Sequence, residues 1–149
     1  MNQRIDYNQV DPLAIKSMMA VENYVHQSGL ESSLCELVKT RASQINGCAY
    51  CLDMHTKDAR KAGESEQRLY LLSAWREAPF YTERERAALT WTEALTLVSQ
   101  QPISDELYQS VKQHFSDKEM VALTMAIVAI NGWNRIAIGF ATVAGTYQP

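Results

Sequence analysis

The chain has 149 residues, the length of a single domain large enough to bury its own core. Apolar residues make up 46% and charged residues 21%, which excludes both a disordered chain and a disulfide-stapled mini-protein. The formal net charge of -3 lacks the basic excess that binds nucleic acids or anionic membranes, so neither partner is expected. We therefore expect one globular domain over residues 1–149.

Helix start and stop signals recur along the chain, and no segment convincingly alternates apolar and polar residues as a strand would. A first helix is predicted after Asp11-Pro12, a favourable N-cap and first-turn pair, and should end at Ser28-Gly29. A second should begin near residues 31–33 and stop at Asn46-Gly47, where glycine suits a left-handed C-cap.

Five further helices are predicted downstream, over residues 48–63, 65–75, 82–97, 105–115 and from 116 onward. Two of them open on the spacing of a capping box, Thr82 with Glu85 and Ser116 with Glu119. The fold class predicted from these signals is all-α, with about six to seven helices in one domain.

The last of these segments contains the longest apolar stretch, residues 120–144. Polar residues between 131 and 135 divide it into two pieces of about ten residues, whereas spanning a membrane takes about 20. We expect a buried helix, packed against another subunit, in which Arg135 finds a carboxylate or carbonyl partner. The N-terminus lacks the apolar run of a secretory signal, so a cytoplasmic location is expected.

Three reactive side chains, Cys48, Cys51 and His55, share one face of the predicted third helix. The amides of a helix N-terminus stabilise a thiolate over a thiol, which lowers the pKa of a cysteine there. His55 lies one turn beyond Cys51 and could accept its proton. The helix dipole alone favours Cys48 as the nucleophile, because Cys48 lies nearer the N-terminus.

The same three residues have two other interpretations. Cys-x2-Cys-x3-His supplies three zinc ligands, but a fourth ligand would have to come from elsewhere. Cys35, the only other thiol, is expected to be a buried core residue. The pair could also be inert core thiols.

Glu36 is a candidate partner for His55. A chain reversal at Asn46-Gly47 would lay the second helix beside the third and bring the carboxylate near the imidazole, which it could orient. The alternative is that Glu36 only closes a helix end, because Ser33 and Glu36 have capping-box spacing.

Residues 36–55 combine Glu36, an eleven-residue gap, Cys-x2-Cys and, after three further residues, a histidine. This pattern resembles the signature of the AhpD-like branch of the carboxymuconolactone decarboxylase family. The segment 131–135, Asn-Gly-Trp-Asn-Arg, is similar to the C-terminal region of its small members. The resemblance implies an all-helical, alkylhydroperoxidase-like subunit that assembles into trimers or hexamers and needs no metal or flavin cofactor.

The resemblance also implies roles for the site residues. Cys51 would be the peroxidatic thiol, Cys48 the resolving thiol and His55 the base, with Glu36 acting on His55 through a water. Some characterised members carry histidine where this chain has Tyr50. The Tyr50 phenol is a donor rather than a base, so it would hydrogen-bond a bound peroxide or the thiolate, or would simply pack.

The function expected is a thiol-dependent peroxidase, with a hydroperoxide as substrate and an external dithiol as reductant. Three alternatives are a disulfide reductase or redox sensor, a zinc-binding interaction module, and an oligomeric scaffold with a relic site. Lactone decarboxylation is disfavoured, because the family members with that activity typically lack the cysteine pair.

Overall fold

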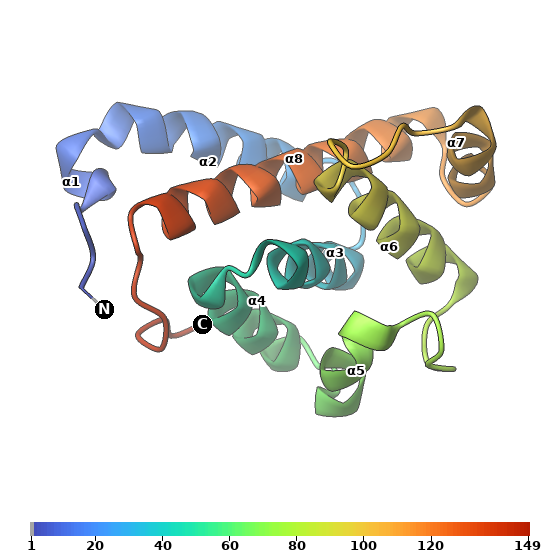
Figure 1. Ribbon diagram of the computed structural model, residues 1–149, viewed down its shortest axis with the longest axis horizontal. Helices are drawn as coiled ribbons and strands as arrows, with labels where there is room; N and C mark the ends of the chain where they lie inside the picture. The colour runs from blue at the N-terminus through green and yellow to red at the C-terminus, as the bar shows by residue number, and fades with distance from the viewer. Residues whose placement is uncertain (1) are drawn as a thin grey trace.

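The computed structural model describes residues 2–149, which form eight α-helices, one short 3-10 helix and no strand (Figure 1). The all-α prediction is therefore confirmed. The helices are α1 (Tyr7–Val10), α2 (Pro12–Gln27), α3 (Ser32–Asn46), α4 (Ala49–Lys61), α5 (Glu66–Leu71), η1 (Leu72–Ala74), α6 (Glu83–Thr96), α7 (Asp105–Lys112) and α8 (Asp117–Gly139).

Helix α3 is the centre of the fold, because it contacts α4, α6 and α8, while α2 and α8 run side by side (Figure 1). Eight of its fifteen residues are buried. The largest apolar cluster joins α2, α3, α6, α7 and α8 around such residues as Val38, Trp91 and Leu123. This arrangement fixes the position of α3, whose last turn leads to Cys48 and the start of α4.

Local sequence signals place most helix ends correctly. Both predicted capping boxes form, Thr82 with Glu85 at α6 and Ser116 with Glu119 at α8. Helix α7 is shorter than predicted, since it ends at Lys112 instead of residue 115. Helix α1, which Asp6 caps, was not predicted.

The C-terminal stretch forms one helix, as predicted, since α8 is continuous over 23 residues. Its interior asparagines do not break the helix because they bind α3. Asn46 donates to Asn131 at 3.0 Å and to Asn134 at 2.8 Å, and Asn134 donates to Ser43 at 3.0 Å. By length and composition alone α8 could cross a membrane, but its contacts with α2, α3 and α6 are those of a core helix.

Arg135 lies on the outer side of α8, so the expectation that it is buried is wrong for the isolated chain. Its guanidinium donates to the carbonyl of Asn131 at 2.8 Å, one turn earlier in the same helix. The predicted carbonyl partner is thus present, and solvent reaches the charge.

Candidate active site

A left-handed turn at Gly47 connects α3 to α4 and lays the two helices against each other. Gly47 has φ of 70°, a conformation that costs glycine little, and the amide of Cys48 donates to the carbonyl of Ser43 at 3.0 Å. The predicted reversal at Asn46-Gly47 is therefore confirmed. It places residues early in α3 beside residues late in α4.

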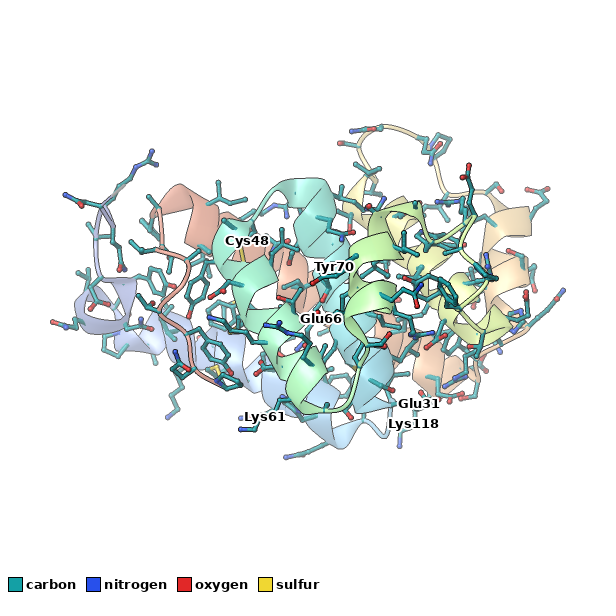
Figure 2. All side chains as sticks on the ribbon, turned by 90° about the horizontal axis from the view of Figure 1, so that it is seen from below. Glu31, Cys48, Lys61, Glu66, Tyr70 and Lys118 are labelled. Carbon is teal, nitrogen blue, oxygen red and sulfur yellow. A yellow bond between two sulfur atoms is a disulfide. The ribbon has the colours of Figure 1, made fainter. Side chains whose placement is uncertain are left out.

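Cys48 and Cys51 are joined by a disulfide at the start of α4 (Figure 2). Cys48 is the N-cap, so the predicted helix start is one residue early, and its sulfur accepts from the Cys51 amide at 3.4 Å. Both cysteines are 1% exposed and pack with apolar residues of α3 and α8, including Ala42 and Ile130. The pair is thus held in a nearly dry environment at a helix N-terminus.

His55 and Glu36 are in direct contact. Glu36 Oε2 lies 2.8 Å from His55 Nδ1, and the side chains of Glu36 and His55 are 18% and 6% exposed, respectively. The capping interpretation of Glu36 is wrong, because Ser33 lies inside α3, whose N-cap is Glu31. A direct contact also differs from the water-mediated one that the family resemblance implied.

A cavity of about 450 Å³ opens beside the redox pair. Cys51, His55, Glu36 and Tyr50 all line it, whereas Cys48 does not. Its other lining residues are mostly apolar or aromatic, with a few charged groups; they are Tyr7, Asn8, Ile15, Met19, Glu22, His26, Lys39, Met54, Asp58, Trp133, Ala137 and Tyr147. A ligand in this cavity would meet one of the two sulfurs.

A buried ion pair in the cavity wall was not predicted from the sequence. Lys39 Nζ lies 2.6 Å from Glu22 Oε2, and the other Glu22 oxygen accepts from Trp133 Nε1 at 3.0 Å. The side chains of Lys39 and Glu22 are 5% and 10% exposed. These residues come from α3, α2 and α8, so no local pattern in the sequence could have grouped them.

The C-terminal segment reaches the same cavity through Tyr147. Its hydroxyl donates to Asp58 at 2.8 Å, and Lys57 Nζ donates to its carbonyl at 2.9 Å. Burial and the Asp58 hydrogen bond raise the pKa of the Tyr147 phenol to about 12. Asp58 lies three residues after His55, which was the one signal in the sequence for its place in the site.

Among residues 2–149, the group that could hold a metal ion is Glu36, His55 and Asp58, whose ligand atoms lie within 4.8 Å of one another. It contains neither cysteine of the predicted zinc set. In the disulfide form, moreover, Cys48 and Cys51 have no thiolate to offer a metal.

The remaining predicted residues differ in their surroundings. Tyr50 is half-buried at the cavity, and burial raises its pKa, which keeps the phenol protonated at neutral pH. Cys35 is buried in the main core as expected, and burial raises its pKa to about 11. Such a thiol is unreactive compared with one at a helix N-terminus.

Known proteins resemble this chain over nearly its whole length. The uncharacterized protein YdfG of Bacillus subtilis (strain 168) is 46% identical over 146 residues, which cover 98% of this chain and 99% of that protein. The crystal structure of an Agrobacterium tumefaciens protein of unknown function, proposed to be the antioxidant defence protein AhpD, is 49% identical with a TM-score of 0.94. That match covers 98% of this chain and 100% of the Agrobacterium chain.

More distant structures share the fold alone. The debrominase Bmp8 in complex with 2,3,4-tribromopyrrole is 15% identical, with a TM-score of 0.82 over 93% of this chain and 74% of its own. The sequence profile of the Carboxymuconolactone decarboxylase family matches residues 12–94, which include α3, α4 and the redox pair. The chain therefore belongs to the carboxymuconolactone decarboxylase family, in its AhpD-like branch.

Proposed function

We propose that the protein is a thiol-dependent peroxidase that reduces organic hydroperoxides through the Cys48–Cys51 pair. The observation that carries this proposal is the position of one redox sulfur, Cys51, in the wall of a largely apolar cavity that also contains His55. An apolar cavity of about 450 Å³ suits the organic part of a small hydroperoxide.

In the proposed cycle His55 first takes the proton of the Cys51 thiol. The Cys51 thiolate attacks the outer oxygen of the hydroperoxide, the O–O bond breaks, and the leaving alkoxide takes the proton from His55 to become an alcohol. Cys51 is now a sulfenic acid. The Cys48 sulfur displaces its hydroxyl group, which leaves as water with the Cys48 proton, and the disulfide forms.

An external dithiol would then reduce the disulfide and become a disulfide itself. This step requires a small or protein-bound dithiol at the mouth of the cavity. A cytoplasmic location suits the cycle, because dithiol reductants are kept reduced there.

The cavity also supports the choice between the two sulfurs. The helix dipole favours Cys48, but Cys48 lies outside the lining, and Cys51 lies within it one turn before His55. Access of the substrate outweighs a dipole contribution that is on the order of 1 kcal/mol. We therefore assign Cys51 as the attacking thiol and Cys48 as the resolving thiol.

The experiment that tests this function is stoichiometric. The reduced protein, freed of reductant, receives one equivalent of cumene hydroperoxide per chain, and free thiols are counted and mapped by peptide. We expect two thiols to be lost as a Cys48–Cys51 disulfide, with one equivalent of alcohol formed. Unreacted thiols would contradict the proposal.

Three variants separate the roles of the thiols. Cys51→Ser should abolish alcohol formation, whereas Cys48→Ser should form one equivalent and then stop with a sulfenic acid at Cys51. Cys35→Ser is the control, because Cys35 lies in the core and outside the lining of the cavity, and the variant should behave as the wild type. Fast exchange with protein disulfides but slow peroxide consumption would instead favour a disulfide reductase or redox sensor.

We also propose that the chain forms a homo-oligomer, a trimer or hexamer, as its resemblance to the family implies. Three large apolar side chains of α8, Val121, Val128 and Ile138, are 56%, 53% and 47% exposed. They lie along the outer side of the helix that Arg135 shares. A second copy of the chain would cover this side.

A further inference from the structure

Three side chains in the wall of the cavity that contains Cys51 bring an imidazole and two carboxylates together. Glu36 comes from α3, while His55 and Asp58 lie about one turn apart on α4. The ligand atoms of the three groups all lie within 4.8 Å of one another, and Glu36 Oε2 is 2.8 Å from His55 Nδ1. All three residues line the cavity, so an ion that enters it can reach them.

The two carboxylates of this group have no lysine or arginine partner in the part of the chain that the structure describes. The side chain of Glu36 is bonded only to His55 there, and that of Asp58 only to the Tyr147 hydroxyl. The one ammonium in the described lining, that of Lys39, is already paired with another carboxylate. Two carboxylate charges so close together repel each other, and partial burial strengthens the repulsion. A divalent cation between them would compensate both charges.

This set of donor atoms suits zinc. Zn²⁺ takes nitrogen and oxygen ligands at about 2.0–2.2 Å, and sites with three protein ligands keep a fourth position for water. Ca²⁺ and Mg²⁺ instead favour six or more oxygen ligands. The ligands of a tetrahedral zinc ion lie roughly 3.3 Å apart. Separations from 2.8 Å to at most 4.8 Å therefore need only small side-chain rotations.

The C-terminal segment, which lies beside α4 (Figure 1), holds Asp58 in place. The Tyr147 hydroxyl donates to Asp58 at 2.8 Å, and the backbone carbonyl of Tyr147 accepts from Lys57 at 2.9 Å. A carboxylate has about four acceptor positions, so this hydrogen bond leaves room for a metal ion. Carboxylates that bind metals are commonly oriented by such hydrogen bonds. Asp58 is thus oriented before any ion arrives.

We propose that Glu36, His55 and Asp58 form a Zn²⁺ site, and that bound Zn²⁺ reversibly inhibits the peroxidase by occupying His55. The binding stands by itself, whereas the inhibition rests on the proposed function, in which His55 takes the proton of the Cys51 thiol. A neutral imidazole has one N–H and one free lone pair on its two ring nitrogens. A metal ion on that lone pair leaves only the N–H, so His55 cannot act as the base whichever nitrogen binds the metal.

Zinc binding is tested on the disulfide form, in which Cys48 and Cys51 offer no thiolate. Isothermal titration calorimetry with ZnCl2, in a buffer free of chelator, should give one Zn²⁺ per chain. Asp58→Asn and Glu36→Gln remove ligands from two different helices and should each weaken binding by about tenfold or more. Asp105→Asn is the matched control, because Asp105 is exposed in the first turn of α7 and should leave the affinity unchanged.

Inhibition is tested in a single turnover, because a dithiol reductant would itself bind zinc through its thiolates. The reduced protein, freed of reductant, is mixed with cumene hydroperoxide at a series of ZnCl2 concentrations, and the rate of alcohol formation is followed. Saturating zinc should lower this rate on the order of 10²-fold, which is the contribution of a positioned base. In Asp58→Asn, the zinc concentration that halves the variant's own zinc-free rate should rise by about tenfold or more.

Two results would overturn the proposal. No zinc bound by the wild type, or wild-type affinity in both Asp58→Asn and Glu36→Gln, would show that the three residues form no zinc site. An unchanged half-inhibiting concentration in Asp58→Asn would show that the reduced thiolates hold the inhibiting metal. If the wild type binds zinc as expected but forms no alcohol from cumene hydroperoxide, the proposed peroxidase function fails while the zinc site stands.

Discussion

At the scale of one residue, the contact between Glu36 and His55 can be tested by a single substitution. At 2.8 Å from Nδ1, the carboxylate holds the imidazole ring in its orientation. Glu36→Gln keeps an acceptor oxygen but removes the charge. We expect kcat for cumene hydroperoxide to fall on the order of 10²-fold, with little change in KM.

The control for this prediction is Glu77→Gln, at an exposed position between η1 and α6. Thermal unfolding of both variants should match the wild type, because the amide oxygen introduced by Glu36→Gln would still accept a hydrogen bond. A Glu36→Gln enzyme with full kcat would remove the carboxylate from the mechanism.

Tyr50 offers a second prediction, because its phenol lines the cavity and its pKa is raised by burial. A protonated phenol there can donate to a bound hydroperoxide. Tyr50→Phe should lower kcat/KM by about threefold to tenfold, which corresponds to one net hydrogen bond of roughly 0.5–1.5 kcal/mol. Steady-state kinetics with a series of hydroperoxide concentrations would measure it.

Tyr147→Phe is the matched control, since Tyr147 lines the same cavity but its hydroxyl is already bound to Asp58. Its kcat/KM should change less than that of Tyr50→Phe. Equal effects of the two substitutions would indicate that both tyrosines act by packing.

Some residues of the candidate site could be predicted from the sequence and others could not, for a physical reason. Cys51 and His55 lie in α4 and Cys48 is its N-cap, so local helical geometry alone brings the three residues close together. The prediction that Glu36 lies beside His55 depended on one tertiary feature, the chain reversal at Gly47. The Glu22–Lys39 pair depends on the packing of α2 against α3, which no local pattern encodes.

At the scale of the element, the Glu119 carboxylate in the first turn of α8 also links this helix to Arg84 of α6. Glu119 accepts from the Ser116 amide at 2.8 Å and from Arg84 at 2.7 Å, and Arg84 also binds Glu31 at the start of α3. The Ser116 backbone amide, the Ser116 hydroxyl and Arg84 lower the pKa of Glu119 from 4.5 to about 2. The folded state therefore favours the ionised carboxylate.

A pH dependence of stability follows from this shift. A lowered pKa stabilises the fold above pH 4.5, and this contribution is lost as the pH falls from 4.5 towards about 2. Glu119→Gln should lose that part of the pH dependence, as measured by urea unfolding at a series of pH values. Glu77→Gln should keep the wild-type slope, and an identical slope in Glu119→Gln would contradict the assignment.

Local signals located the helix starts that side chains cap, but they did not show which helix the polar residues of α8 contact. The capping boxes at α6 and α8 act within four residues, so the sequence shows them directly. The asparagines inside the apolar stretch of α8 bond to Asn46 and Ser43 of α3, contacts that the sequence alone did not show. Polar residues inside this apolar segment therefore belong to a contact between helices.

At the scale of the whole molecule, the exposed side of α8 is the surface that a second copy would cover. A charge at Val128, in the middle of this side, would be desolvated in such an interface but stays hydrated in the single chain. We expect Val128→Asp to shift sedimentation from an oligomer towards the 16.8 kDa chain. The helix content of the variant should be unchanged, since 53% of this residue is exposed.

Val98→Asp is the control for that experiment, because Val98 is 58% exposed but lies after the end of α6 and not on α8 itself. It should sediment as the wild type does. If Val128→Asp also sediments as the wild type, another surface forms the oligomer. If the wild type sediments as a single chain, each chain carries a complete site, since the residues assigned to the cycle come together within one chain.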